Sequence, residues 1–353
     1  MKVIIHAGMH KTGSSSIQRT LAEAKLTDHT YAPWEKPNHS SLFQLLFRDP
    51  VEDYRGFKIE GLTRANLLAK RTEWLTRNTA TLEENAAKTI VYSGEDLSSR
   101  HDFGITEKFA AYLRQFTQNI EVICYVRPPV SFMASTLQQN VKSNNLSRLN
   151  PNKLWPYYRD RLEKFDRIFG ANNVRLVKFE KSGLTNGDAV TDFLTWIGIN
   201  PSDINILNTN ESLSLETLAL VFAQRKLTDG LAKGFKGAGR ANRIAVRALS
   251  ETGNTPIALA PEFYERVLKR NRQDLAWIDQ RMGTSMMDTP KFSPNPIRSE
   301  DQLIDIALGL VEKLDETLPK SLSNQNTETD RRERLIRYFQ LLQENAQAQL
   351  AKT

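Results

Sequence analysis

Four short apolar runs stand out in a chain whose other residues are largely polar. They cover residues 3–6, 89–93, 121–126 and 174–179, and polar or turn residues bound each of them. Long helix-prone stretches separate the runs, and strands that alternate with helices predict a parallel sheet covered by helices on both faces. We therefore expect an α/β fold with three layers and a parallel central sheet.

The stretch between the first two predicted strands is polar and helix-prone. Side chains recur in it at helical spacing, namely Leu67, Leu68, Arg71, Trp74 and Leu75. A loop at residues 33–37, PWEKP, interrupts it, and Tyr31 and Trp34 belong to this region. The two aromatic side chains have two interpretations, which are ordinary surface packing and stacking against a sugar ring.

Residues 225–253 carry an excess of positive charge. Seven cations oppose only Asp229 and Glu251, which gives +5; they are Arg225, Lys226, Lys233, Lys236, Arg240, Arg243 and Arg247. Several glycines make the middle of this segment flexible. The segment is either a solvated mobile loop or a basic lid that closes over a nucleotide or an acidic acceptor.

A proline-marked loop at residues 289–296 precedes the last part of the chain. Beyond it an apolar stripe predicts an amphipathic helix, formed by Leu335, Phe339, Leu342 and Ala346. We expect one α/β domain over 1–288, with the basic segment as a flexible insertion, and a C-terminal helical extension over 289–353 packed on the same domain. The alternative is that the apolar stripe of this last helix packs against a second copy of the chain and forms a homodimer.

Composition narrows the classes of protein to consider. The single cysteine, Cys124, lies in an apolar run, so an intrachain disulfide is excluded and a reducing, cytoplasmic compartment is expected. The chain shows no signal-peptide pattern, and no apolar run approaches the roughly 20 residues that span a bilayer, so we expect no membrane span. The net charge of +7 suits a polyanionic ligand, a nucleic acid or an anionic membrane surface, and it does not choose among them.

The segment after the first predicted strand carries the clearest chemistry. An apolar strand runs into a turn of glycine and hydroxyl residues that opens a helix, in the sequence VIIHAGMHKTGSSSIQ. Backbone N–H groups at such a helix N-terminus bind anions, and the helix dipole adds positive charge. Gly8, Gly13 and Ser15 match the ATP-binding pattern G-x-x-x-x-G-K-[ST], but Ser14 follows Gly13 and the lysine comes earlier, at Lys11. The alternative is a plain serine helix cap with a solvated lysine.

The displaced lysine resembles the 5′-phosphosulfate loop of sulfotransferases that use 3′-phosphoadenosine 5′-phosphosulfate, the activated sulfate donor, and the chain looks like a bacterial cytosolic member. The resemblance covers residues 1 to about 280 and is specific near 5–18, 92–98 and 125–135. It implies a fold related to P-loop nucleoside triphosphatases and a donor site made of Lys11, Thr12, Gly13, Ser14, Ser15 and Ser16. Lys11 would stabilise charge on the bridging oxygen of the leaving phosphate, and no metal is required.

A second part of the resemblance follows the third predicted strand, in CYVRPPVSFMASTLQQ. Arg127 stands at the strand end, prolines then start a helix, and Ser135 follows Arg127 by eight residues. In the family an arginine and a serine at this spacing hold the 3′-phosphate of the donor, and a guanidinium with a hydroxyl suits a phosphate dianion. A surface arginine beside a helix cap is the alternative.

The second predicted strand ends in VYSGEDLSS, which puts Glu95 and Asp96 where open parallel sheets bind ligands. In the carbohydrate-modifying branch of the family a glutamate here takes the proton of the acceptor hydroxyl, so the resemblance assigns the base to Glu95. A helix N-cap at Ser93 or Asp96 is the structural alternative. His6 and His10 are rival bases.

These expectations favour a sulfotransferase that acts on a hydroxyl or an amine, with a carbohydrate or glycolipid acceptor and no nucleic-acid partner. An ATP-dependent small-molecule kinase is the alternative, with Mg²⁺ held at Glu95 or Asp96. A non-enzymatic basic protein that binds a glycan or a nucleic acid is the third hypothesis. This third hypothesis explains the net positive charge of the chain but not the loop of glycine and hydroxyl residues after the first predicted strand.

Overall fold

The computed structural model describes residues 1–143, 146–207, 212–231, 237–288 and 293–351. The chain forms two compact units, each assembled from three stretches. The first unit takes Met1–Pro128, Tyr157–Asn210 and Gln273–Met286, and the second takes Pro129–Pro156, Glu211–Arg272 and Met287–Thr353. The C-terminal segment therefore shares a unit with two stretches from inside the expected 1–288 domain. The expected division into one α/β domain over 1–288 and a C-terminal extension packed on it stays a prediction.

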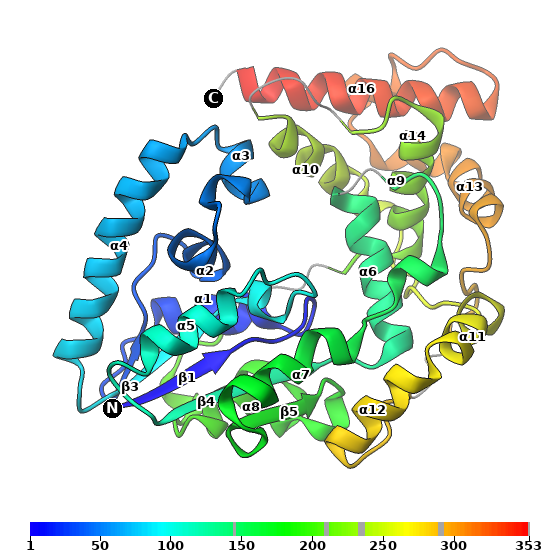
Figure 1. The fold of residues 1–353 in the computed structure, drawn as a ribbon. Coiled ribbons are helices and arrows are strands. Elements are labelled where there is room, and N and C mark those ends of the chain that lie inside the picture. The colour runs from blue at the N-terminus through cyan, green and yellow to red at the C-terminus, as the bar shows by residue number, and fades with distance from the viewer. Residues whose placement is uncertain (144–145, 208–211, 232–236, 289–292, 352–353) are drawn as a thin grey trace. The chain divides into compact units, whose positions relative to one another are not determined.

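Within the described residues, the first unit is built on a five-stranded sheet in which all neighbouring strands are parallel. The strands are β1 Lys2–His6, β2 His29–Tyr31, β3 Thr89–Ser93, β4 Ile120–Val126 and β5 Val174–Lys178, and their order across the sheet is β2-β3-β1-β4-β5. Figure 1 labels β3, β1, β4 and β5. Each apolar run in the sequence forms a strand whose ends lie within one residue of the expected ones. An α/β fold with a parallel central sheet is confirmed.

Helices surround this sheet. Those of the first unit are α1 Ser14–Glu23, α2 Ser40–Phe47, α3 Arg55–Ile59, α4 Arg64–Glu84, α5 Ile105–Leu113, α7 Tyr158–Phe169, α8 Ala189–Trp196 and nearly all of α12 Arg272–Met282. The helix expected around Trp74 is confirmed as α4. Successive side chains of a strand point to opposite faces, so each face of the sheet can bury its own set of helices.

One face of the sheet shares a core with α1 and α8. Ile4 from β1 and Tyr125 from β4 join Ile17 from α1 and Phe193 from α8 in a buried cluster. The Tyr125 hydroxyl donates to Oδ2 of Asp192 at 2.8 Å, so its polar end is satisfied inside the core. This core fixes α1, and with it the loop before α1, to the central strands.

The opposite face carries an aromatic core. The ring of Tyr92 from β3 lies 6.3 Å from the ring of Phe43 in α2 and 5.1 Å from that of Phe109 in α5. These separations are typical of packed aromatic pairs. The sheet is therefore covered by helices on both faces, as the alternation of strands and helices predicts.

The apolar pattern misses β2, which covers only His29–Tyr31 and is half-buried. β2 pairs with β3 and forms an edge of the sheet. A short edge strand needs no continuous apolar run, because only strands buried on both faces require one.

The second unit is helical. Its helices are α6 Pro129–Ser143, α9 Leu215–Leu227, α10 Ala238–Ala248, α11 Pro261–Arg270, α13 Glu300–Leu308, α14 Val311–Thr317, α15 Lys320–Ser323 and α16 Arg331–Ala351. The expected stripe is confirmed in α16, where Leu335, Phe339, Leu342 and Ala346 are buried. α16 contacts α10, α13 and α15, so the stripe packs inside this unit, and a homodimer stays a prediction. None of the described helices, in either unit, is long and apolar enough to cross a membrane.

Part of the basic segment has regular structure. Residues 238–248 form α10, so the expectation of a mobile loop is wrong there, and the basic lid stays a prediction. Arg225 is 4% exposed and donates to backbone carbonyls of α6, while Lys226 forms an ion pair with Glu300 at 2.6 Å. These two cations therefore form contacts within the second unit, Arg225 with α6 and Lys226 with α13. The segment's two other lysines, Lys233 and Lys236, lie outside the described residues.

The burial of α1 can be tested through Ile17, which has no exposed surface. We expect Ile17→Ala to lower the free energy of unfolding by about 2–5 kcal/mol, because it leaves a cavity in the core beneath α1. Arg19→Ala, at an exposed position of the same helix, should change it by less than about 0.5 kcal/mol. Urea unfolding followed by circular dichroism measures both, and equal losses would contradict the assigned faces of α1.

Candidate functional site

The loops that follow β3, β1 and β4 leave the sheet at the same edge, because these three strands are parallel neighbours. From β1 the chain continues to β2, and from β4 it continues to β5, on the opposite side. The edge between β1 and β4 is therefore a topological switch point, where open parallel sheets bind ligands. Residues 7–13 after β1, residues 94–98 after β3 and Arg127 after β4 form the candidate site.

Backbone hydrogen bonds hold the loop after β1 against β4. The amides of Ala7 and Met9 donate to carbonyls of β4 at 2.9 and 3.1 Å. The loop then turns through Lys11 and Gly13, whose φ angles of 67° and 82° lie in the left-handed region. Glycine adopts this conformation without a steric cost, so Gly13 lets the chain enter α1 directly from the turn.

The serines of this loop do not cap α1. Its N-cap is Gly13, no side chain of a described residue caps it, and Ser14, Ser15 and Ser16 follow as the first helical residues. The interpretation of the serines as a simple helix cap is therefore wrong. The first N–H groups of a helix lack carbonyl partners within it and carry the positive end of its dipole, which suits an anion.

Polar side-chain atoms converge beside Gly8. A Cβ at this position would lie 2.8 Å from Nε2 of His6, 3.1 Å from Oγ1 of Thr12 and 3.3 Å from Oγ of Ser14. All three side chains are at most 1% exposed, and Nε2 of His6 has no hydrogen-bond partner among the described residues. We call this group of His6, Thr12 and Ser14 the polar cradle. Glycine is needed at position 8 because any side chain would collide with it.

The other loop residues surround the polar cradle with different exposures. Ser15 is exposed, Lys11 and Gly13 are half-buried, and Ser16 is buried. Oγ1 of Thr12 donates to the Met9 carbonyl at 2.6 Å, which ties the turn to the first part of the loop. The residues expected to bind the 5′-phosphosulfate, Lys11 to Ser16, thus lie together in the turn and the first residues of α1.

Arg127 fastens the loop to the end of β4. Its Nη1 donates to the carbonyl of Lys11 at 2.5 Å, and its guanidinium lies 5.6 Å from the ring centroid of Phe179. Arg127 is half-buried, so the alternative of a plain surface arginine is wrong. Ser135, its expected partner at the 3′-phosphate, is a buried residue of α6 in the second unit, and that pairing stays a prediction.

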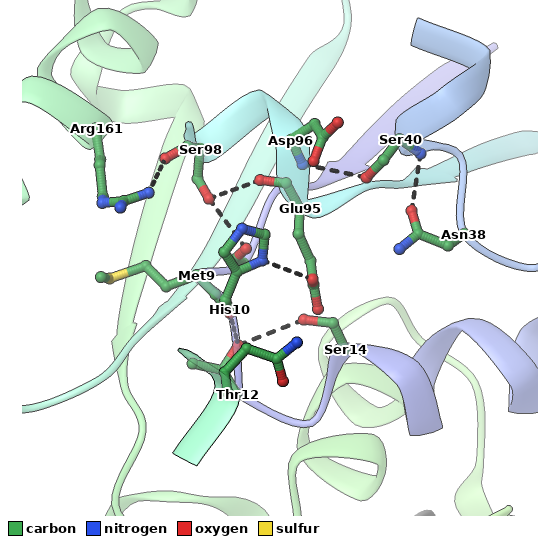
Figure 2. Close-up of polar contacts among 12 residues, drawn as sticks. Met9, His10, Thr12, Ser14, Asn38, Ser40, Glu95, Asp96, Ser98 and Arg161 are labelled. Atoms are coloured by element: carbon green, nitrogen blue, oxygen red, sulfur yellow. Dashed lines mark hydrogen bonds and ion pairs between the residues drawn. The ribbon is translucent and has the colours of Figure 1, made fainter. Parts of the chain in front are cut away.

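His10 and Glu95, which the sequence treats as rival bases, form a pair. Nδ1 of His10 lies 2.7 Å from Oε2 of Glu95 (Figure 2). The side chain of His10 is 50% exposed and that of Glu95 is 18% exposed. The Ser14 hydroxyl also lowers the pKa of Glu95, so Ser14 connects the pair to the polar cradle.

The two members of this pair shift each other's pKa in opposite directions. Burial disfavours the charged form of each group, but the hydrogen bond and the opposite charge of the partner outweigh burial. The pKa of His10 is raised and that of Glu95 is lowered. His6 differs, because burial lowers its pKa to about 4 and keeps it neutral.

The second acid after β3 has a structural role. Glu95 and Asp96 open the short 3-10 helix η2 Glu95–Ser98, whose N-cap is a glycine without a side-chain cap among the described residues. The expected cap at Ser93 or Asp96 is therefore wrong. The Asp96 carboxylate accepts a hydrogen bond from one side chain of α2 at 3.2 Å. The Asp96 backbone amide donates a hydrogen bond to another side chain of α2 at 3.1 Å. Asp96 thus anchors η2, and Glu95 contacts the loop.

A cavity of about 510 Å³ lies beside β2, and Tyr31 and Trp34 are among its lining residues. The polar atoms of both rings already have partners. The Tyr31 hydroxyl donates to the carbonyl of Pro37 at 2.5 Å, and Nε1 of Trp34 donates to Oγ of Ser41 at 3.1 Å. Local packing explains these contacts, and a role in sugar stacking stays a prediction.

Comparison with known proteins adds no assignment to this site. Neither a scan against protein-family models nor a search of curated proteins found a match to this chain. The functional argument therefore depends on the residues of the site and on their chemistry.

Two buried neutral histidines should make the fold sensitive to acid. Burial lowers the pKa of His6 and of His39 from 6.5 to about 4. Between pH 6.5 and 4 the unfolded chain binds protons on these imidazoles and the folded protein does not. The free energy of unfolding should therefore decrease as the pH is lowered from 6.5 to 4, by about 3 kcal/mol for each histidine.

Urea titrations at several pH values measure this decrease. His39→Gln, which removes one buried imidazole, should flatten the fall in stability toward acid pH. His101→Gln, at an exposed position, should leave the fall unchanged. An identical pH dependence in the His39 variant and the unaltered protein would show that His39 does not titrate as described.

Proposed function

We propose that this protein is a sulfotransferase that moves a sulfuryl group from 3′-phosphoadenosine 5′-phosphosulfate to a hydroxyl or amine, with a carbohydrate or glycolipid acceptor. The observation that carries the proposal is the polar cradle at the N-terminus of α1, at the switch point of a parallel sheet. The sequence resemblance of this loop supplies the identity of the anion. Assignment of the fold to the sulfotransferase branch of P-loop proteins is part of the same proposal.

The residues present fit a phosphate group. A buried polar atom without a partner costs free energy, and Nε2 of His6 is such an atom beside the hydroxyls of Thr12 and Ser14. A ligand that supplies hydrogen-bond partners here would remove that cost. The uncapped helix N-terminus adds positive charge at the same place.

When bound, the donor supplies an activated sulfuryl group attached to a phosphate that leaves. The backbone of residues 12–15, with the hydroxyls of Thr12, Ser14 and Ser15, would hold the 5′-phosphate. Lys11 would stabilise the negative charge that develops on the bridging oxygen. Arg127 would keep Lys11 in place through the Lys11 carbonyl, in addition to its expected contact with the 3′-phosphate.

The pair of His10 and Glu95 would receive the proton that the acceptor hydroxyl loses as it attacks. Both side chains have partly exposed surface, so the pair is open to an acceptor. Positioned acid–base groups of this kind contribute about 100- to 10,000-fold to a rate. The proposal requires no metal, because a sulfuryl group carries less charge than a phosphoryl group.

Adenosine 3′,5′-bisphosphate should raise the melting temperature without a metal. At about 100 times its dissociation constant, a ligand specific for the folded state adds roughly 2.7 kcal/mol to stability. ATP with Mg²⁺ and a single-stranded oligonucleotide serve as the comparison ligands in the same thermal-shift assay. Stabilisation by ATP with Mg²⁺ alone would support the kinase alternative, and stabilisation by the oligonucleotide alone would support the non-enzymatic one.

Lys11→Met should reduce the rate of sulfuryl transfer by about 100- to 1,000-fold, because it removes the charge that stabilises the leaving phosphate. Methionine keeps an unbranched side chain at this left-handed position. Lys25→Met, at an exposed position after α1, is the matched control and should leave the rate unchanged. Single-turnover transfer measures both variants. Normal turnover in Lys11→Met would mean that Lys11 is a solvated surface charge.

A further inference from the structure

We propose that His10 is the base that takes the acceptor proton, at Nε2, and that Glu95 is a positioning residue that acts through His10. This inference rests on the proposed sulfuryl transfer. It changes the role that sequence resemblance gives to Glu95, and it follows from the contacts of the pair.

Glu95 is already engaged on the side that faces the loop. Its Oε2 lies 2.7 Å from Nδ1 of His10, and the Ser14 hydroxyl also favours its charged form by lowering its pKa. Its side chain is 18% exposed, against 50% for His10. Protonation of the carboxylate would neutralise it and so weaken the charge-assisted hydrogen bond that it accepts from His10, and hydrogen bonds of this kind are the stronger ones in proteins.

The same hydrogen bond fixes the tautomer of His10. An ionised carboxylate only accepts hydrogen bonds, so Nδ1 of His10 carries the hydrogen and Nε2 carries the lone pair. Nε2 makes no hydrogen bond to a described residue, and half of the side chain is exposed. The basic nitrogen of the pair is therefore the one that an acceptor hydroxyl can approach.

The proton transfer balances within this arrangement. The acceptor oxygen forms its bond to sulfur while the bond from sulfur to the bridging oxygen breaks, and the electron pair of the broken bond stays on the phosphate beside Lys11. The hydroxyl proton moves to Nε2 of His10. Glu95 stabilises the imidazolium that results, as a carboxylate does for the histidine of a catalytic triad. The exposed ring then returns the proton to water.

Charges around His10 come from three elements. Glu95 and Asp96 on η2 favour the imidazolium, Arg161 on α7 opposes it, and Lys11 follows His10 in the loop. Arg161 is held in place by a hydrogen bond to the carbonyl of Ser98 at 3.0 Å. Burial acts against the charged ring, but the carboxylates outweigh it and leave the pKa of His10 raised. Because a base must be unprotonated, the transfer rate should rise with pH through this pKa.

Nuclear magnetic resonance of the free protein tests the pair without any turnover. The ring nitrogens of His10 should show hydrogen on Nδ1 and none on Nε2 at alkaline pH. Glu95→Gln should lower the pKa of His10, because it removes the negative charge that stabilises the imidazolium. Glu95→Asp keeps a negative charge and should therefore keep part of the rise in the pKa of His10. His101→Gln identifies the signals of an exposed histidine and serves as the control. An unchanged pKa of His10 in Glu95→Gln would overturn the pairing.

The pH dependence of single-turnover transfer tests the roles. His10→Gln should lose about 100- to 10,000-fold in rate and lose the rise with pH. Glu95→Gln should keep that rise but move it to lower pH, and the double variant should be no slower than His10→Gln. If Glu95 is the base, His10→Gln should keep a pH-dependent rate near that of the unaltered protein, and Glu95→Gln should lose it. That result would overturn the inference.

Binding of adenosine 3′,5′-bisphosphate separates this inference from the proposed function. Both single variants should keep the thermal shift that this nucleotide causes, because His10 and Glu95 face the acceptor. If both variants bind the nucleotide but Glu95→Gln loses the pH-dependent rate and His10→Gln keeps it, only the roles given to His10 and Glu95 are contradicted, and the proposed function is not. Absence of binding in the unaltered protein would contradict the proposed function, and the resonance experiment would still report on the pair.

Discussion

The candidate site depends on the pairing of β1 with β3 on one side and β4 on the other. His6, the last residue of β1, lies opposite Ser93 and Ile123 in register. Because all three strands are parallel, their ends deliver Glu95, the loop after β1 and Arg127 to one edge. A shift of one residue in either pairing would turn every side chain of β1 to the other face, so the register that buries the core also builds the site.

The same pairing explains a costly feature of the loop. His6 is buried, its Nδ1 lies 2.7 Å from Oγ of Ser93, and its Nε2 is directed at the loop beside Gly8. A core position at the end of a strand would be more stable with an apolar side chain, since a buried polar atom without a partner costs about 1–3 kcal/mol. Such a cost, at the edge where open parallel sheets bind ligands, is consistent with the proposed ligand as the missing partner.

The sequence predicts this architecture well where a pattern is local. Strands buried on both faces need continuous apolar runs, and the strand–turn–helix at Gly8 to Gly13 is visible because turns demand particular residues. The contact between His10 and Glu95 joins residues that are 85 positions apart, and it follows from strand register, which local patterns do not contain. The sequence does not predict helix α10, because glycines and cations conceal its buried alanines, Ala241 and Ala245.

Lys11 shows how the loop combines strain with function. Its φ angle of 67° lies in the left-handed region, which costs a residue with a side chain roughly 1–2 kcal/mol relative to the right-handed one. Glycine would avoid this cost, as it does at Gly13. Arg127 compensates by holding the Lys11 carbonyl at 2.5 Å. A strained residue that a half-buried guanidinium keeps in place, next to the helix terminus proposed to bind the donor, is consistent with a need for the lysine charge at that point.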